Sequence, residues 1–353
     1  MFETDTVKVI VFTMAYNAQA TIRRTIESIL NQTFENFQYY ILDNASADDT
    51  EDIIGEYAEK DQRIVPLHVN KNDPPNGGAF FHAIVHATDA KYIVWCDADD
   101  AYTSDFLENM VGFAEENQLD MAACGYDKVD GLTGKIIKHR VLDKNLILHD
   151  QLFADEFIQY RGFISYLWGK LYSIPFLKER HITGTIKKER ICNDSIGTLW
   201  MFRNAKRAGI YGKAMYRYYQ YPGSLSHKNI ELSLHSYRDL WTATKEYLED
   251  CGPVSKLNED FLHAIHLSLV DEAAGNVFIA ELNTEKKLEL LEEIFSDPVW
   301  QETLKRDADP MFRNLAGRKE FISEIKEKVL SLPEIEQYSL ERHGLFAHLD
   351  ASR

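Results

Sequence analysis

Short apolar runs alternate with amphipathic segments through the first 126 residues, and this alternation constrains the fold more than any other feature of the sequence. Repeated strand–helix units predict an α/β domain with a mainly parallel, twisted sheet and helices on both of its faces. Five runs have the length and the β-branched or aromatic composition of buried strands: residues 7–14, 37–43, 63–69, 91–96 and 120–126.

The segments between these strands carry helix patterns. Ile22, Ile26 and Ile29 fall on one helical face, and Asn17 is the expected N-cap of that helix. A loop is expected at 73–78, before a short helix at 79–88. Pro66 indicates that the third strand is at an edge, because proline cannot donate a ladder hydrogen bond.

Beyond residue 135 the pattern becomes mixed and then helical. A strand is expected at 166–174, a helix at 192–208, an aromatic strand at 213–221 and a loop at 222–228. Four later segments have amphipathic helix patterns, at 231–250, 258–282, 284–297 and 318–331. We therefore expect two domains, an α/β domain in residues 1–228 and an all-helical C-terminal domain in residues 229–353.

The composition limits the partners of the chain. It has 353 residues, 45% of them hydrophobic, and a formal net charge of −17. Nucleic-acid binding needs basic surfaces that contact phosphates, so we expect no nucleic-acid partner. The same charge opposes simple electrostatic docking on anionic lipid, although a local basic patch stays open as an alternative.

The N-terminus and the cysteines indicate the compartment. Acids stand near the N-terminus where a signal peptide has basic residues, and no apolar stretch approaches the ~20 residues needed to span a bilayer. The four cysteines lie far apart and show no disulfide or zinc-site spacing. We expect a cytoplasmic protein with reduced thiols and no transmembrane segment.

Polar residues follow three of the expected strands where each strand ends. Tyr16 and Asn17 follow the first strand, Asp43 ends the second, and Asp97 and Asp99 follow the fourth. Parallel sheets bind ligands at the carboxyl ends of their strands. We therefore expect these side chains to meet at one edge of the sheet.

The segment YIVWCDADD places Asp97 and Asp99 directly after a buried strand. Mg²⁺ and Mn²⁺ prefer oxygen ligands and are commonly held by one or two carboxylates together with substrate phosphates. The pair therefore fits a metal–diphosphate complex. The alternative is a solvated strand-to-helix loop in which an aspartate caps the next helix.

Three other residues are candidates for the site, and two of them, Asp43 and Asp194, also have a structural alternative. Asp43 could accept hydrogen bonds from a nucleobase or a ribose, or it could serve the turn in DNASADD. Tyr16 could stack on a base. Asp194 stands where a helix begins, so it is either a helix cap or a general base for an acceptor hydroxyl.

Five separated motifs resemble those of the family 2 glycosyltransferases, which have the GT-A fold. The stretch from VIVFTMAYN through SILNQTF to DNASADDTEDII is similar to the opening of that family. YIVWCDADD is similar to its metal-binding strand end, and LWGKLYS, NDSIGTLW and YYQYPGSLS follow in the family's order. The resemblance covers roughly residues 7–228.

The resemblance implies an inverting, metal-dependent transfer of a hexose from a nucleotide-diphosphate sugar, most commonly a UDP-sugar, to an acceptor hydroxyl. Asp99, together with Asp97, would hold Mg²⁺ or Mn²⁺, and Asp194 would be the catalytic base. The residues that it implies in nucleotide-sugar binding are Ala15, Tyr16, Asn17, Asp43, Asp97, Ala98, Trp168, Lys170 and His227.

The chain also departs from the family's pattern, mainly where the family handles the diphosphate. No arginine directly precedes the segment 222–228, and Tyr219 and Tyr221 lie there instead. The other departures are Met14 for a proline, Asn44 for an aspartate, Phe81-His82 for an Arg-Asn pair, and Asn193 for the first acid of an acidic pair.

The resemblance further implies that the chain builds a cell-surface glycan on a glycan or lipid-linked acceptor. That work would place it at the inner membrane face by peripheral association, and the C-terminal helices are a candidate interface for a homo-oligomer. One alternative is an inactive nucleotide-sugar-binding module that acts through its helical domain. Another is a phosphoacceptor receiver domain, which predicts a single unit of ~120 residues. Release of diphosphate from a donor in Mn²⁺ would distinguish an enzyme from a binding module.

Overall fold

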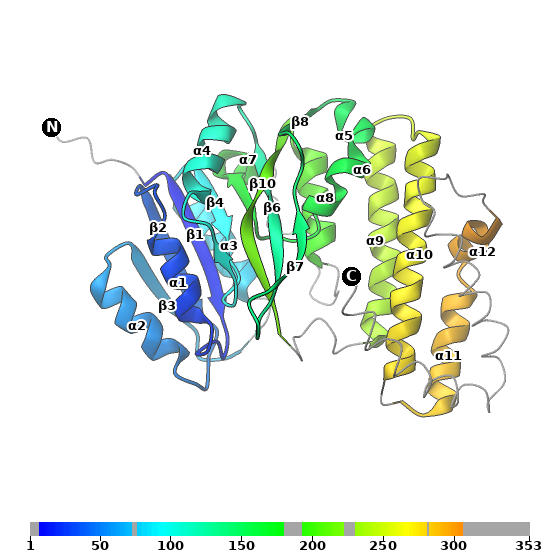
Figure 1. The fold of residues 1–353 in the computed structure, drawn as a ribbon, viewed down its shortest axis with the longest axis horizontal. Coiled ribbons are helices and arrows are strands. Elements are labelled where there is room, and N and C mark those ends of the chain that lie inside the picture. Colours follow the sequence, from blue (N-terminus) through cyan, green and yellow to red (C-terminus); the bar gives the residue numbers. More distant parts are fainter. Residues whose placement is uncertain (1–6, 73–75, 180–192, 222–229, 281, 306–353) are drawn as a thin grey trace. The chain divides into compact units, whose positions relative to one another are not determined.

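The computed structural model describes residues 7–72, 76–179, 193–221, 230–280 and 282–305 (Figure 1). Contacts between residues divide the chain into two compact units. The first comprises Met1–Lys188 and Gly197–Pro222, and the second comprises Glu189–Ile196 and Gly223–Arg353. The first unit is an α/β structure built on one sheet, and the second is helical in its described residues.

Four parallel strands form one end of the sheet, in the order β3 (Ile64–His68), β2 (Phe37–Asp43), β1 (Val9–Ala15) and β4 (Tyr92–Trp95). Residues 9–12 of β1 are at most 1% exposed. This burial on both faces explains why the sequence of β1 is apolar without alternation. β3 is the edge strand, as Pro66 indicates.

Helices cover both faces of these strands. α1 (Ile22–Leu30), α2 (Thr50–Lys60) and α4 (Phe106–Glu116) share one buried core with one face of the sheet, where Ile26 and Val11 are fully buried. On the other face, Phe81 of α3 (Asn76–Ala87) packs edge-on against Phe12, with ring centroids 6.2 Å apart. Val11 and Phe12 point to opposite faces because successive strand residues alternate.

Antiparallel strands complete a mixed sheet. β9 (Lys170–Ser173) lies between β4 and β6 (Met121–Asp130) and is antiparallel to both. β10 (Arg207–Gln220) runs parallel to β6, while β5 (Ala101–Tyr102) and β8 (Leu146–His149) pair antiparallel with β10. β7 (Ile136–Arg140) forms a hairpin with the second half of β6. β6 therefore runs in the same direction as β1 and β4, so their carboxyl ends share one edge of the sheet.

Shorter elements connect these strands. They are α5 (Leu152–Asp155), α6 (Phe157–Tyr160), the 3-10 helix η1 (Arg161–Phe163), α7 (Ile174–Glu179) and α8 (Asn193–Asn204).

The second unit contains the long helices α9 (Ile230–Asp250) and α10 (Lys256–Ile279), followed by α11 (Thr284–Phe295) and α12 (Pro298–Lys305). Ser255 caps α10 by accepting a hydrogen bond from the backbone N–H of Asn258 at 3.2 Å. Asn283 caps α11 in the same way. Such caps satisfy N–H groups that a helix cannot pair internally.

None of the helices in the part of the chain that the structure describes is both long and apolar enough to cross a membrane.

The expected fold class, an α/β domain followed by helices, is confirmed, and the four adjacent parallel strands β3, β2, β1 and β4 come from its first half. Several local predictions are wrong. The helix expected at 192–208 ends at Asn204, and the strand expected at 213–221 begins earlier, at Arg207. Asn17 is not the N-cap of α1, because that helix begins at Ile22 after Thr21. Residues 76–78 belong to α3 and not to the preceding loop. The helix expected at 318–331 and the loop at 222–228 lie outside the described residues.

Candidate functional site

Three neighbouring parallel strands bring the predicted polar residues to one edge of the sheet. β1 lies between β2 and β4, and Ala15 at the end of β1 is in register with Asp43 at the end of β2. Asp97 follows β4 by two residues. Because adjacent strands lie about 4.8 Å apart, the ends of β2 and β4 are about 10 Å apart across β1.

The residues 97–100 after β4 form a tight turn, which we call the acid turn. The backbone N–H of Asp100 donates to the carbonyl of Asp97 at 3.2 Å. Side chains of α1 hold its carbonyls: Thr21 Oγ1 donates to Ala98 O at 3.1 Å, and Thr25 Oγ1 donates to Asp100 O at 2.8 Å. The acid turn is therefore fixed by the helix that packs beside it.

Asp100 ties the acid turn to β10. Its carboxylate is fully buried and accepts hydrogen bonds from the hydroxyl of Tyr216 at 2.7 Å and from the backbone N–H of Tyr219 at 2.8 Å. Burial, together with repulsion from Asp97 and Asp99, raises the pKa of Asp100 well above its usual value. Asp100 has an internal structural role, which leaves Asp97 and Asp99 as the candidate ligands.

Asp97 and Asp99 are half-buried beside Asp100. The indole N–H of Trp95 donates to Asp97 Oδ1 at 2.7 Å. Burial raises the pKa of Asp99, and the charge of Arg24 opposes that change. Asp97 and Asp99 are the two carboxylates of the acid turn that could ligate a hard divalent cation, whose charge would offset the burial of Asp99.

Arg24 of α1 supplies a positive charge beside the acid turn. Its guanidinium donates to the carbonyl of Asp99, and Nη1 donates to the hydroxyl of Tyr221 at 3.0 Å. The guanidinium carbon lies 3.7 Å from the ring centroid of Tyr219. Arg24 Nε is buried with no hydrogen-bond partner among the described residues. The guanidinium of Arg24 therefore contacts Tyr219 and Tyr221, which lie just before segment 222–228.

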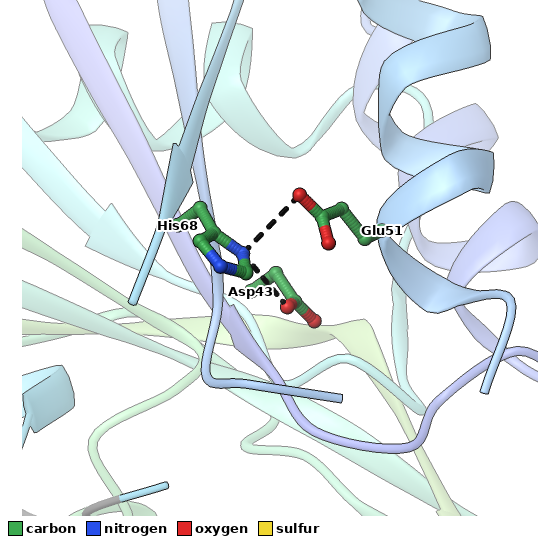
Figure 2. A group of neighbouring side chains, drawn as sticks. All are labelled: Asp43, Glu51 and His68. Carbon is green, nitrogen blue, oxygen red and sulfur yellow. Dashed lines mark ion pairs between the residues drawn. The ribbon is translucent and has the colours of Figure 1, made fainter. Parts of the chain in front are cut away.

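Asp43 is 1% exposed at the end of β2, and only one of its carboxylate oxygens is occupied (Figure 2). Oδ2 accepts from the backbone N–H of Ser46 at 3.2 Å and lies 3.3 Å from Nδ1 of His68. Oδ1 is buried with no hydrogen-bond partner among the described residues. A buried acceptor without a partner is costly, so Oδ1 is suited to a ligand N–H or O–H.

His68 and Glu51 complete a cluster with Asp43 (Figure 2). His68 Nδ1 lies 3.3 Å from Glu51 Oε1, and one ligand atom from each of the three residues lies within 4.8 Å of the others. The cluster has the donor types of a metal site. Exposure of His68 and Glu51 to water is equally consistent with a plain ion-pair network.

The loop after β1 is shaped by contacts with the loop after β2. Asn17 has a left-handed φ of 49°, its N–H donates to Ser46 Oγ at 2.9 Å, and its Oδ1 accepts from Ala47 N at 2.8 Å. These bonds explain why Asn17 does not cap α1. Ala15 is fully buried, whereas Tyr16 is 47% exposed, so the Tyr16 ring is available for stacking.

Trp168 and Lys170 lie inside an aromatic cluster next to the acid turn. Trp168 is 5% exposed and stacks on Tyr216 and on Tyr166, with centroids 4.3 Å apart in each pair. Lys170 is buried, and its ammonium donates to the carbonyls of Tyr166 and Trp168. Gly169 between them has a φ of +66°, which favours glycine. Both side chains are therefore internal, and Trp168 supports Tyr216, whose hydroxyl binds Asp100 of the acid turn.

The structure does not show the last two predicted site residues, Asp194 and His227, together with the others. Asp194 is exposed in the first turn of α8, in the segment that groups with the second unit. His227 lies outside the described residues.

The sequence reasoning missed Arg24, His68 and Tyr216. His68 ends β3, so the same strand-end argument that found Asp43 would have found it. Arg24 and Tyr216 meet the acid turn from positions 75 and 116 residues away, and no local pattern marks such contacts.

Comparisons with known proteins find similarity to glycosyltransferases. A model of the family described as glycosyl transferase family 2 matches residues 10–203. The chain is 28% identical over 218 residues to the uncharacterized glycosyltransferase EpsJ of Bacillus subtilis (strain 168), covering 60% of each chain. It is 22% identical over 330 residues to the glycosyltransferase GlyA of Streptococcus pneumoniae serotype 4, covering 90% of this chain. The match spans 60% and 46% of the lengths of these two relatives.

The fold is also similar to a solved structure. Residues 1–349 of S. aureus TarS in complex with UDP superpose with a TM-score of 0.61 and 17% identity, covering 96% of this chain and 92% of that one. The same part of TarS is also known in complex with UDP-GlcNAc. This likeness confirms the GT-A-type architecture expected from the sequence.

Proposed function

Because the chain belongs to glycosyltransferase family 2, we propose that it transfers a hexose from a UDP-sugar to an acceptor hydroxyl, with inversion at the anomeric carbon. The observation that carries this proposal is the pairing of two features at one sheet edge: the acid turn, and the unpartnered buried Oδ1 of Asp43 two strands away. The acid turn suits a cation-bound diphosphate, and Oδ1 of Asp43 suits a nucleobase.

We assign the nucleobase to Asp43 and Tyr16. An ionised carboxylate only accepts hydrogen bonds, so Asp43 Oδ1 selects a base that presents an N–H. Uracil has such a donor at N3, where cytosine has an acceptor. The exposed ring of Tyr16 would stack on the base, and Asn17 would hold the loop that presents it. The UDP complexes of the similar TarS support the choice of uridine.

We assign the diphosphate and its cation to the acid turn. Asp99 and Asp97 would hold Mg²⁺ or Mn²⁺, with the backbone of Ala98 between them. When bound, such a cation offsets negative charge on the departing diphosphate, which supplies several kcal/mol in comparable sites. Arg24 would add a second positive charge from α1, in place of the arginine that the family shows before segment 222–228. His227 in that segment is assigned to the same diphosphate on the family resemblance.

We assign proton removal to Asp194. The acceptor oxygen attacks the anomeric carbon as the bond from that carbon to the diphosphate oxygen breaks, and the diphosphate leaves with the bonding electrons. The acceptor proton passes to the carboxylate of Asp194. General-base assistance of this kind is worth about 10²–10⁴-fold in rate. Trp168 and Lys170 would act indirectly, by fixing the aromatic wall that positions the sugar.

We propose that the acceptor is a glycan or a lipid-linked glycan of the cell surface, at the inner membrane face. The family resemblance supports this assignment. The helical second unit would then serve the acceptor or a second copy of the chain.

The proposal is tested with the full chain and a panel of nucleotide sugars, with and without Mn²⁺, by measuring the nucleoside diphosphate released. A sugar transferase releases UDP from at least one UDP-sugar, and Asp194→Asn lowers that rate at least about 100-fold without weakening UDP binding. The contrasting outcome is tight nucleotide binding with no release in any combination. That outcome would assign the chain to the class of inactive binding modules.

A further inference from the structure

The β6–β7 hairpin exposes apolar side chains to solvent. Among the residues that the structure describes, six large apolar or aromatic side chains are exposed, and four of them belong to this hairpin and its flank. They are Leu132 (75% exposed), Ile136 (52%), Ile137 (37%) and Val141 (38%). Isolated exposed leucines need no explanation, but a group of four on one element marks an interaction site.

The strand β7 also lacks a buried face. Residues 136–139 are all exposed, although successive strand residues point to opposite sides of a sheet. A strand on the edge of a soluble domain normally buries one face against the core. The fold therefore leaves the side chains of Ile136 and Ile137 exposed to water. Leu132, in the turn between β6 and β7, is exposed as well.

Positive charges gather on the same hairpin. Lys128 of β6 pairs directly with Lys138 of β7, and Arg140 lies two residues farther on the same side. Like charges in direct register destabilise a strand pair. Neighbouring atoms that partly shield the ammonium group from water, together with repulsion from Arg140 and Lys128, lower the pKa of Lys138 although the residue as a whole is exposed. Arg140 Nε is also buried with no hydrogen-bond partner among the described residues.

This local charge is opposite to that of the whole chain. Residues 128–141 contain four basic residues, Lys128, Lys135, Lys138 and Arg140, and one acid, Asp130, whereas the chain has a net charge of −17. A basic patch flanked by exposed isoleucine and leucine side chains is complementary to a surface with anionic headgroups above an apolar layer. Long basic side chains can reach lipid phosphates while their stems stay in the apolar boundary.

The hairpin is connected to the candidate active site. It extends from the carboxyl end of β6, at the same sheet edge as the acid turn (Figure 1). Tyr126 of β6, in register with Arg140, packs edge-on against Trp168 with centroids 5.1 Å apart. Trp168 in turn stacks on Tyr216, whose hydroxyl binds Asp100.

We propose that the β6–β7 hairpin, residues 128–141, is a membrane-docking element for anionic phospholipid. Leu132, Ile136 and Ile137 insert into the headgroup boundary, and the basic residues contact lipid phosphates. If the proposed function holds, docking at this sheet edge places a lipid-linked acceptor close to the acid turn. The docking itself does not depend on sugar transfer.

The test is sedimentation of the full chain with vesicles of phosphatidylcholine alone or with about one-third phosphatidylglycerol, without donor or metal. We expect binding to the anionic vesicles only, weakening as salt rises. Lys135→Gln with Lys138→Gln should lower vesicle affinity about 25-fold, since each basic residue near such a surface contributes about fivefold. Leu132→Ser with Ile136→Ser should lower it roughly tenfold or more.

Matched controls come from the second unit. Lys256→Gln and Leu257→Ser alter an exposed lysine and a 41% exposed leucine at the start of α10, and they should leave vesicle binding unchanged. Thermal melting checks that each variant folds. Equal vesicle binding by wild type and both hairpin variants would overturn the proposal, as would loss of binding only in the α10 variants. Hairpin variants that dissociate a dimer in the absence of vesicles would assign the hairpin to a second copy instead.

UDP release is measured separately in solution with a soluble acceptor. A chain that docks on vesicles but releases no UDP contradicts the proposed function alone. A chain that releases UDP but ignores anionic vesicles contradicts the docking element alone.

Discussion

His68 Nδ1 lies 3.3 Å from Oδ2 of Asp43, the buried carboxylate that we assign to the nucleobase. The other neighbours of the imidazole nitrogens are also oxygens, those of Glu51 and Asn70. Because Oδ2 is held by His68 and Ser46, the rotation of the carboxylate is fixed and Oδ1 is left for a ligand.

His68→Phe should therefore weaken donor binding without impairing chemistry. The contact of His68 with Oδ2 is an ion-pair distance, and such contacts are worth up to about 1 kcal/mol, so we expect the KM for the UDP-sugar to rise up to about fivefold while kcat changes less than twofold. The control is His149→Phe, which changes another half-exposed histidine of the same unit. An equal effect of both substitutions on KM would show that His68 does not orient Asp43.

Asp43→Asn should change which base the chain prefers. Ser46 N–H and His68 need an acceptor at the Oδ2 position, so the amide oxygen of an asparagine should take that place. The amide NH₂ would then point where Oδ1 lies now, and it would meet the N–H of uracil N3 unfavourably and the N3 acceptor of cytosine favourably. We expect UDP affinity to fall at least about tenfold, and the ratio of CDP to UDP affinity to rise. Calorimetric titration with both nucleotides measures this ratio, and an unchanged ratio would contradict base reading by Asp43.

Arg24→Gln should impair handling of the diphosphate. The substitution removes the positive charge beside the acid turn and the hydrogen bond to the carbonyl of Asp99. We expect kcat/KM to fall at least about tenfold, with Arg24→Lys intermediate because lysine keeps the charge without the planar fork. The neighbouring Arg23→Gln is a matched control, since Arg23 lies on the surface of the same helix and forms an exposed ion pair with Glu56. Steady-state kinetics in which both arginines matter equally would refute the assignment.

His266 should make the stability of the helical unit depend on pH. Burial in α10 lowers the pKa of His266 from 6.5 to about 4. Between these values the unfolded chain binds the proton and the folded chain does not, so stability is fully present above about 6.5 and is lost as pH falls through 4. The shift corresponds to about 3 kcal/mol at most. Hydrogen exchange of α9 and α10 amides should show this loss in wild type and a smaller one in His266→Phe, and identical pH profiles would rule it out.

The parallel half of the sheet could be predicted because its strands are buried on both faces. Residues 9–12 are almost wholly covered, and such a segment must be continuously apolar. The ends of those strands then place Asp43, Asp97 and Asp99 at one edge by topology alone. The mixed half could not be ordered from sequence, since β9 reaches its place between β4 and β6 only through pairings far along the chain.

The candidate site shows the same division. Asp97 and Asp99 were predicted from their position after β4, but the sequence could not show that Asp100 turns inward to Tyr216. Asn17 was assigned as a helix cap because asparagine is favoured there, yet its hydrogen bonds to the loop after β2 hold it in a left-handed conformation. Tertiary contacts of this kind decide which of several locally suitable roles a residue takes.

The central proposal is that Asp97 and Asp99 would hold a cation that offsets the charge of the donor's diphosphate. The most direct measurement is the affinity of the full chain for UDP with and without Mn²⁺, in wild type, in Asp99→Asn and in the control Asp150→Asn, whose side chain is 94% exposed. We expect Mn²⁺ to raise UDP affinity at least about tenfold in wild type and in the control, and to have little effect in Asp99→Asn. An equal gain in all three proteins would contradict the proposal.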